Sequence, residues 1–405
     1  EGLEHLPAGW GVKRLYDVAF QPKDRIRISH LTPKNYVGVD NLLQNGQGKR
    51  EATFIPKGNA KTSGYAQNDI LIGNIRPYLK KIWLADTEGG TNGDVVVLRV
   101  RNAGVVAPRF LYYVLRRDAF FDYMMRFIKG VKMPRGDKKA ILNFTIPLPP
   151  LKEQHAIAAF LDDKTSKLDR LITKKSCLLQ SLKAYKHALI SEVATKGLAA
   201  TPTKQSGLDW LGEIPTGWEL AELKRLLDYE QPTKYLVKSD DYKHYKPHYK
   251  TPVLTAGKGF LLGYTNETEG IYPASKENPV IIFDDFTTTF HCVDFPFKVK
   301  SSAIKLLTPK RNLVSLKFTY YAMLSMDFKP RPRDHMRHWI TKYSIFKIPL
   351  PPLPEQHAIA AFLDEKTSKL DRLMAKLQTQ IKALKAYKSA LISEAVLGQI
   401  PKDRL

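Results

Sequence analysis

Cysteine is scarce in this chain of 405 residues, which contains only Cys177 and Cys292. Two cysteines cannot build a disulfide framework or a four-cysteine zinc site, and their scarcity favours the cytoplasm as the compartment. Long apolar runs are missing too, so we expect no transmembrane helix. The N-terminal residues also lack the basic-then-apolar order of a signal peptide. These absences predict a cytoplasmic protein without a membrane partner.

Acidic residues are outnumbered, since 40 Asp and Glu face 64 Lys and Arg, which leaves a net charge of +24. A basic excess of this size is typical of proteins that bind a polyanion. Residues 1–147 contain 24 basic and 13 acidic side chains, a net charge of +11. Residues 209–347 contain 21 and 16, a net charge of +5. The first segment therefore carries the larger share of the excess.

Motifs of DNA-modifying enzymes are absent as well. The chain has no Asn/Asp-Pro-Pro-Tyr/Phe sequence, which an amino-methyltransferase would need, and no phosphate-binding P-loop, because Gly46–Lys49 is too short. Asp284 and Asp285 follow an apolar run, but no Glu-x-Lys follows at the spacing of a metal-dependent nuclease. His155 and His357 occur in expected helices with no acidic or cysteine constellation of a catalytic site beside them, so packing or an interface is their simplest role. These observations predict a non-catalytic chain.

What the chain does contain is a long internal repeat. Residues 148–171 read LPPLKEQHAIAAFLDDKTSKLDRL and residues 350–373 read LPPLPEQHAIAAFLDEKTSKLDRL. Each copy ends alike, in KAYKHALISE from Lys183 and KAYKSALISE from Lys385. The segments that precede the copies show almost no likeness to each other. This pattern indicates that one supporting element, called the mount below, occurs twice in the chain. Each copy would carry a different domain, called a head below.

Both copies of the repeat are expected to be helices. The pairs Pro149–Pro150 and Pro351–Pro352 suit helix starts, while Gly197 and Gly398 suit helix ends. Each helix would span roughly 45 residues, or about 65 Å. The predicted organisation is a head (1–147), a helix (148–198), a linker (199–208), a second head (209–347), and a distal helix with its tail (348–405).

Apolar positions recur within each helix at alternating spacings of three and four, which is typical of a heptad seam. The expected seams are Leu168, Leu171, Lys175, Leu178, Leu182, Tyr185 and Leu189, and Leu370, Leu373, Leu377, Gln380, Leu384, Tyr387 and Leu391. Such a stripe must be buried, and the other copy is the obvious partner. We expect an intramolecular antiparallel coiled coil whose polar members, Lys175 and Gln380, help to set the register. Pairing between two chains is the alternative.

The heads have the pattern of mixed, mostly β domains, so the predicted fold class is α+β. Strand-like runs are residues 69–73, 94–100, 252–255, 279–283 and 303–307, and helix-like runs are 109–115 and 318–324. Both heads open with Pro-x-Gly-Trp, ending at Trp10 and Trp218, and both close on Ile-Pro-Leu-Pro-Pro. The shared ends indicate one fold for both heads despite unlike sequences.

With the order head, helix, head, helix, the chain resembles the specificity (S) subunit of type I restriction-modification systems. The resemblance rests on PLPPLKEQ at 147–154, PLPPLPEQ at 349–356, the opening of the second head at 207–218, and LIGNIRPYLK at 71–80. It implies two target-recognition domains, each reading one half of a bipartite site in double-stranded DNA. It also implies a pseudo-two-fold arrangement in which the helices act as a spacer and as a dock for two methyltransferase (M) subunits.

The resemblance further implies that this chain has no cofactor of its own. The partner methyltransferase subunits would bind S-adenosylmethionine and methylate one adenine in each half-site. Two restriction (R) subunits would bind ATP and Mg²⁺ and complete a translocating nuclease.

Basic and aromatic clusters in the heads are the candidates for DNA contact, because Lys and Arg neutralise phosphates and Arg also reads base edges. The candidate residues are Arg76, Tyr78, Lys80, Lys81, Lys129, Lys132, Arg135, Lys138, Lys139, Lys258, Arg331, Arg333, Arg337, His338 and Trp339.

Outer-face residues that match between the repeats predict an identical partner bound twice. The candidate partner-binding residues are Glu153, Gln154, Asp169, Arg170, Glu355, Gln356, Asp371 and Arg372. The Glu-Gln pairs would alternatively cap the helix start or contact the head. Two other functions stay open from the residues alone, namely a self-contained DNA-modifying enzyme and a coiled-coil assembly protein whose charge is incidental.

Overall fold

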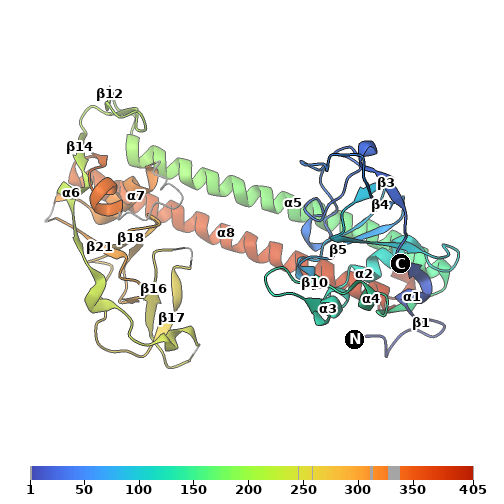
Figure 1. Ribbon diagram of the computed structural model, residues 1–405. Coiled ribbons are helices and arrows are strands. Elements are labelled where there is room, and N and C mark those ends of the chain that lie inside the picture. Colours follow the sequence, from blue (N-terminus) through green and yellow to red (C-terminus); the bar gives the residue numbers. More distant parts are fainter. Residues whose placement is uncertain (1, 245, 258, 311–312, 327–337, 405) are drawn as a thin grey trace. The chain divides into compact units, whose positions relative to one another are not determined.

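The computed structural model describes residues 2–244, 246–257, 259–310, 313–326 and 338–404 (Figure 1). The chain divides into two compact units, the first formed by residues 1–176 and 378–405 and the second by residues 177–377. Each unit holds one head together with parts of the two long helices, α5 (Leu151–Lys196) and α8 (Leu353–Val396). The predicted helices therefore exist, and each begins directly after its Pro-Pro pair.

The first head is built around a four-stranded sheet, ordered β2-β8-β5-β6, and a three-stranded sheet, ordered β3-β4-β7. Two further pairs, β1-β11 and β9-β10, complete it, and all of its strand pairs are antiparallel. The strands are β1 (Gly11–Arg14), β2 (Ala19–Phe20), β3 (Arg25–Arg27), β4 (Lys61–Tyr65), β5 (Ile70–Gly73), β6 (Ile82–Leu84), β7 (Gly89–Thr91), β8 (Val95–Val100), β9 (Ile128–Lys129), β10 (Arg135–Gly136) and β11 (Thr145–Leu148). The helices are α1 (Leu15–Val18), α2 (Pro108–Leu115), α3 (Asp118–Arg126) and α4 (Lys138–Ile141).

The second head has a four-stranded sheet, ordered β15-β21-β18-β19, and a three-stranded sheet, ordered β17-β16-β20. Its pairs are antiparallel except for β16 with β20, which is parallel. The strands are β12 (Thr203–Gln205), β13 (Glu213–Pro215), β14 (Glu219–Glu222), β15 (Leu227–Glu230), β16 (Thr251–Leu254), β17 (Leu261–Thr265), β18 (Val280–Asp284), β19 (Phe290–Val293), β20 (Lys298–Val299), β21 (Ile304–Pro309) and β22 (Lys347–Leu350). The helices are α6 (Leu223–Leu226) and α7 (Leu316–Ser325).

The two heads share their central architecture, as their matching ends predicted. In each head the strand that directly follows the Pro-x-Gly-Trp sequence pairs with the last strand, β1 with β11 and β14 with β22. In each four-stranded sheet the chain also visits the strands in the same order, because β2, β8, β5 and β6 correspond to β15, β21, β18 and β19. All five predicted strands and both predicted helices, now α2 and α7, are confirmed.

Both four-stranded sheets are buried on two faces. In β5, Ile70 and Ile72 pack into the core formed with α2 and the long helices, while Leu71 faces a second core around Trp83. In β18, Ile281 and Ile282 divide between two cores in the same way. Successive side chains of a strand point to opposite faces, so continuous apolar runs such as Val95–Leu98 satisfy both cores at once.

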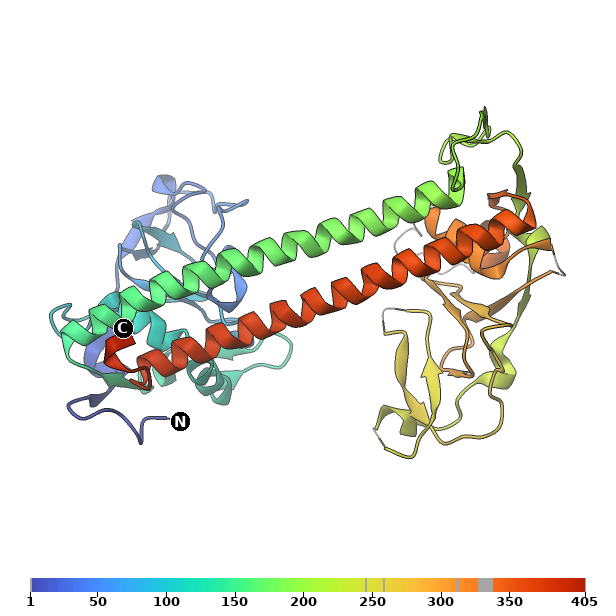
Figure 2. The ribbon, with the colours of Figure 1, turned by 180° about the vertical axis from the view of Figure 1, so that it is seen from behind.

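Within each unit, α5 and α8 pack side by side and antiparallel, as the two views of Figures 1 and 2 show. In the first unit, Lys175 Nζ donates to Gln380 Oε1 at 2.8 Å and Lys388 Nζ donates to Asp169 at 2.6 Å. Higher residue numbers in α5 therefore face lower residue numbers in α8, which is the mark of antiparallel helices. The predicted intramolecular pairing is present, and its two polar seam members are bonded to each other.

Five of the fourteen predicted seam positions were wrong by one residue. Leu171, Leu178 and Tyr185 are 41%, 48% and 57% exposed, and Leu373 and Tyr387 are 44% and 57% exposed. The neighbours that follow them line the interface instead, namely Ile172, Leu179, Lys186, Met374 and Lys388, together with Ile381 after Gln380. The resulting seam runs through 161, 165, 168, 172, 175, 179, 182, 186, 189 and 193, which keeps the heptad spacing. At residues 171–172, 178–179 and 373–374 both adjacent residues are apolar, so spacing alone did not decide between them. At residues 185 and 387 the tyrosine lies outward, and the lysine that follows it bonds an aspartate of the other helix.

The predicted linker, residues 199–208, is partly ordered. Its central residues form β12, which pairs antiparallel with β13. Gly197 ends α5 with a positive φ of 81°, and Gly398 follows α8 with a φ of 70°, as expected for glycines that close helices.

Candidate nucleic-acid interface

The first head brings together two basic clusters that lie about 50 residues apart in the sequence, residues 76–81 and 129–139. The Arg76 backbone N–H donates to the Pro134 carbonyl oxygen at 2.8 Å, and Ile75 forms a β-bridge with Arg135. The second cluster is a hairpin in which β9 and β10 pair Lys129 with Arg135. The two clusters therefore form one continuous basic surface.

Most of the predicted contact residues on this surface are exposed, namely Arg76, Tyr78, Lys129, Lys132, Arg135, Lys138 and Lys139. Lys80 and Lys81 are only partly exposed. Lys80 forms an ion pair with Asp118 at 2.7 Å, and Lys81 Nζ donates to the Val39 carbonyl at 2.7 Å. Burial lowers the pKa of Lys81 below its ordinary value. These two lysines hold the cluster in place, whereas the exposed residues are available to a phosphate.

Local backbone conformation sets the shape of this surface. Arg76 and Lys80 both have left-handed backbones, with φ of 52° and 50°, on either side of the short turn Pro77–Leu79. Non-glycine residues rarely adopt this region, so the surrounding packing must hold the turn. Asp137 accepts the N–H groups of Lys139 and Ala140 at the start of α4. Those two bonds lower the pKa of Asp137, so its carboxylate stays charged.

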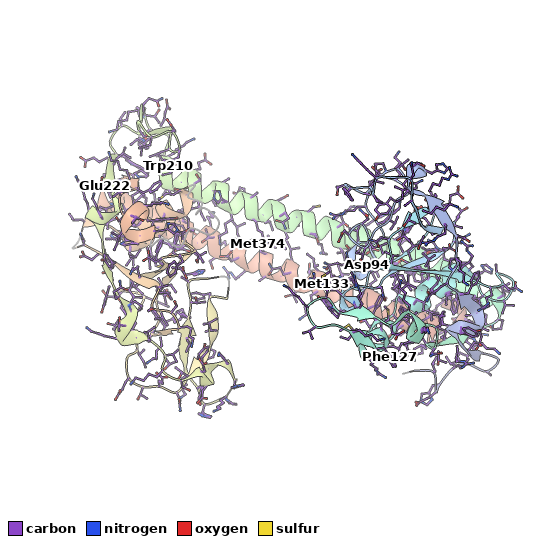
Figure 3. All side chains as sticks on the ribbon, in the orientation of Figure 1. Asp94, Phe127, Met133, Trp210, Glu222 and Met374 are labelled. Atoms are coloured by element: carbon purple, nitrogen blue, oxygen red, sulfur yellow. The ribbon has the colours of Figure 1, made fainter. Side chains whose placement is uncertain are left out.

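The tip of the hairpin carries an apolar feature that the basic pattern concealed. Val131 is fully exposed at 100%, and Met133 is 52% exposed, between Lys129, Lys132 and Arg135. Figure 3 labels Met133 on this head. The signal was visible in the sequence as apolar residues inside a glycine- and proline-bounded basic loop, but their exposure needed the fold.

In the second head, His338 and Trp339 are core residues, which corrects their assignment as DNA contacts. Their exposures are 0% and 2%, and the Trp339 ring packs edge-on against Phe283 with centroids 5.3 Å apart. Asp285 accepts the Trp339 N–H at 2.7 Å and lies 3.5 Å from Lys305 Nζ, both side chains being 1% exposed. An aromatic residue beside a basic run was read as surface, but packing placed it inside.

The other predicted contacts of this head, Lys258, Arg331, Arg333 and Arg337, lie outside the described residues. Exposed basic residues also gather around Tyr242 and Tyr249 in the stretch before β16. Lys300 Nζ lies 5.3 Å from the Tyr242 ring centroid, and Lys246 Nζ donates to the Tyr249 hydroxyl at 3.0 Å. Lys300 comes from a distant part of the sequence, so only the fold places it here.

Each head contacts its long helix through the same set of bonds. Trp10 Nε1 donates to Glu153 at 3.0 Å, and Trp218 Nε1 donates to Glu355 at 3.1 Å. Tyr113 and Tyr321 likewise donate to Asp162 and Asp364, at 2.6 and 2.7 Å. These pairs explain why the residues are repeated, since each helix start receives a head in the same way.

Gln154 and Gln356 are 0% and 1% exposed and bond the backbone of their own unit. Gln154 Oε1 accepts the Ala107 N–H and Gln356 Oε1 accepts the Ser315 N–H, both at 2.8 Å. A side chain with no exposed surface offers nothing to a second subunit. We therefore interpret both glutamines, with Glu153 and Glu355, as contacts between head and helix, which was one of the open alternatives.

The remaining predicted partner-binding residues divide into two groups. Asp169 bonds Lys388, and Asp371 bonds Lys186 at 2.6 Å, so both aspartates pair across the two helices. Arg170 and Arg372 are exposed. The arginines stay candidates for partner contact.

The exposed faces of the helices carry a second matched set. In the first unit these are Leu171 of α5 and Tyr387 of α8, and in the second unit Leu373 of α8 and Tyr185 of α5. Lys167 and Lys369 are exposed one turn before the two leucines. All of these residues are identical at corresponding positions of the repeat. Each unit thus presents one copy of this matched set of exposed apolar and basic residues.

Within the part of the chain that the structure describes, no three His, Cys, Asp or Glu side chains cluster where they could hold a metal ion. No described helix combines the length and hydropathy that a membrane span requires.

A family model described as the type I restriction modification DNA specificity domain matches residues 7–180 and 215–383, once over each head and its adjoining helix. The chain belongs to this family. Two matches within one specificity chain agree with the repeat in the sequence and with the two heads of the structure.

Relatives of this specificity chain carry the corresponding description. The EcoR124I/EcoR124II specificity subunit of Escherichia coli is 45% identical over 198 residues, which cover 46% of this chain and 48% of that one. The match thus spans about half the length of that relative. The MjaVIII specificity subunit of Methanocaldococcus jannaschii is 25% identical over 360 residues, 82% of this chain and 79% of the relative.

The fold is also shared with solved structures. A chain from a structure described as showing complex assembly and conformational transition of the type I R-M system superposes with a TM-score of 0.66 at 19% identity, covering 98% of this chain and all of that one.

Proposed function

We propose that this chain is the DNA sequence-specificity subunit of a type I restriction-modification complex, in which each head reads one half of a bipartite site. The observation that carries the proposal is the pair of near-identical helix mounts joined to two heads of one fold and different surfaces. Phosphate contacts by exposed Lys and Arg would position each head, and a few loop side chains would select bases.

The exposed helix surface supports two methyltransferase subunits as partners. A seam alone would require only seam positions to match, yet Lys167, Leu171 and Tyr185 match their counterparts and are exposed. Like surfaces bind like partners, and each unit presents one copy. The chain itself would supply no catalysis, with S-adenosylmethionine bound by the methyltransferase subunits and ATP with Mg²⁺ by two restriction subunits.

The function is tested by methylation mapping in cells that carry this chain with its methyltransferase. Long-read sequencing should reveal a two-part motif with one modified adenine in each half. A continuous motif, or methylation that does not depend on this chain, would contradict the proposal.

The docking surface is tested by placing a negative charge on it in one unit at a time. Leu171→Glu should leave one methyltransferase subunit bound, and the double variant L171E/L373E should leave none, as measured by native mass spectrometry of the purified complex. Gln180→Glu, which adds the same charge at an exposed position of the helix whose counterpart is Lys382, serves as a control for charge alone. Two subunits retained by the double variant would exclude this surface.

A further inference from the structure

We infer that the hairpin tip of the first head, Val131 and Met133, is an apolar wedge that enters DNA between neighbouring base pairs of its half-site. This inference rests on the proposed function and adds a way of reading DNA that the basic residues alone do not provide.

The tip is built to project. Gly130 turns the chain with a φ of 87°, Val131 follows at 100% exposure, and Met133 is 52% exposed. Figure 1 shows the hairpin, near the β10 label, extending as a loop from the body of the head. Phe127 and Ile128 are also 43% and 36% exposed, so four large apolar side chains lie open within one short segment. A group of exposed apolar side chains of this kind indicates a contact with a binding partner.

Charge around the tip identifies that partner as a polyanion. Lys129, Lys132 and Arg135 surround the two apolar residues and are all exposed. Lys138 and Lys139 continue the series at the start of α4, where Asp137 is the one acidic residue between 129 and 139. An acidic protein would attract the lysines equally well. Apolar side chains surrounded by cations are complementary to DNA, however, because its base stack is flanked by phosphates.

The base of the hairpin is fixed to the body of the head by backbone hydrogen bonds and an ion pair. Gly136 N–H donates to the Asn74 carbonyl at 3.0 Å, and Arg76 N–H donates to the Pro134 carbonyl at 2.8 Å. Arg135 also pairs with Asp94 at 3.1 Å. These bonds tie the hairpin to the buried strand β5 and to the basic turn after it. Insertion of an apolar side chain between base pairs unstacks them and kinks the duplex, which requires such a fixed support.

Two physical consequences follow. The base step that the wedge enters must lose stacking, and the sequences that unstack at least cost, such as TA and CA steps, should be favoured there. Sequence preference would then arise at a position that no hydrogen-bonding side chain of the head touches.

The test uses the complex of this chain with its methyltransferase subunits and duplexes that carry the mapped site. The stacking probe 2-aminopurine is placed at each step of the half-site read by the first head, leaving out the adenine that is methylated. Wild-type complex should raise its fluorescence several-fold at one step. V131S/M133S should abolish that rise and weaken binding by about tenfold, while V131I/M133L should retain both.

Phe54→Ser, which removes an exposed apolar side chain elsewhere on the same head (74% exposed), should leave the fluorescence rise unchanged. Steps in the other half-site should not respond to V131S/M133S. Specific binding with no unstacked step, or a rise that survives V131S/M133S, would overturn the wedge alone. Loss of methyltransferase subunits from V131S/M133S without a change in stacking would assign the tip to protein contact. A wild-type complex without site-specific binding would overturn the proposed function and the wedge with it.

Discussion

The two heads of this chain share their strand order and their attachment to the long helices, yet they differ in how their surfaces are supported. The first head displays a basic hairpin that is tied to the sheet through backbone bonds at Asn74, Arg76 and Gly136. The second head contains an ion pair, Asp285 with Lys305, in which both side chains are buried, and no ion pair among the described residues of the first head is buried on both sides. The attachment is alike in both heads because both must fit the same mount. The recognition surface is not constrained by the mount and can differ between the heads.

The attachment shows what that shared constraint preserves. Tyr113 and Tyr321 bond equivalent aspartates, but the cation beside them is Arg109 in one unit and Lys317 in the other. Geometry and charge are kept while the residue type changes. A head can therefore diverge almost completely provided that a few contacts with the helix start remain.

The largest expected effect separates the two heads. Asp285→Ala leaves Lys305 buried without its carboxylate and should destabilise the second head by about 3–5 kcal/mol. Hydrogen exchange followed by mass spectrometry should show faster exchange in β18 and β21 and no change in β5 and β8. Asp209→Ala, at an exposed residue of the same head, is the control. Equal loosening of both heads would mean that they are not independent in stability.

A smaller and matched effect is expected at the shared attachment. Gln154→Ala and Gln356→Ala each leave a buried backbone N–H without an acceptor, which costs about 1–3 kcal/mol. The two losses should agree within about 0.5 kcal/mol, as read from hydrogen exchange of α2 in one variant and α7 in the other. Gln180→Ala, on the exposed face of α5, should change neither. A loss confined to one unit would break the equivalence of the two mounts.

The smallest expected effect is a difference in stability between the two matched ion pairs that join α5 and α8. The Lys388 side chain is 10% exposed, and burial lowers the pKa of Lys388, whereas the matched Lys186 side chain is 26% exposed. Removing the acidic partner should therefore cost more in the buried pair. Asp169→Ala is expected to cost about 1–3 kcal/mol, as for a hydrogen bond to a charged group. Asp371→Ala should cost less than about 1 kcal/mol, as for an exposed ion pair.

Urea unfolding followed by helix circular dichroism measures this difference, with Asp163→Ala as the control because its partner Lys167 lies on the same exposed helix face. If Asp371→Ala proved the more costly change, burial would not be what distinguishes the two pairs.

Much of the fold was predictable because its signals are local. Residues 279–283 and 303–307 are apolar runs of strand length, and β18 and β21 form there. The candidate site was less predictable. Lys129 and Lys139 could be proposed from composition, but the backbone contact between Arg76 and Pro134 that joins the two clusters depends on long-range pairing. The same limit explains the error at Trp339, because nothing local separates an aromatic surface residue from one that a buried aspartate draws inward.

The sequence alone determined the repeat, the start of each helix after its Pro-Pro pair and the heptad spacing of both helices, because proline geometry and heptad spacing act over short distances. The sequence left open whether the helices pair within one chain or between two, and the contacts between α5 and α8 decided it. Only the tertiary structure decided that Ile172 and Leu179, rather than Leu171 and Leu178, enter the seam. Adjacent apolar residues lie about 100° apart on a helix, and packing against the second helix selects which of them is buried.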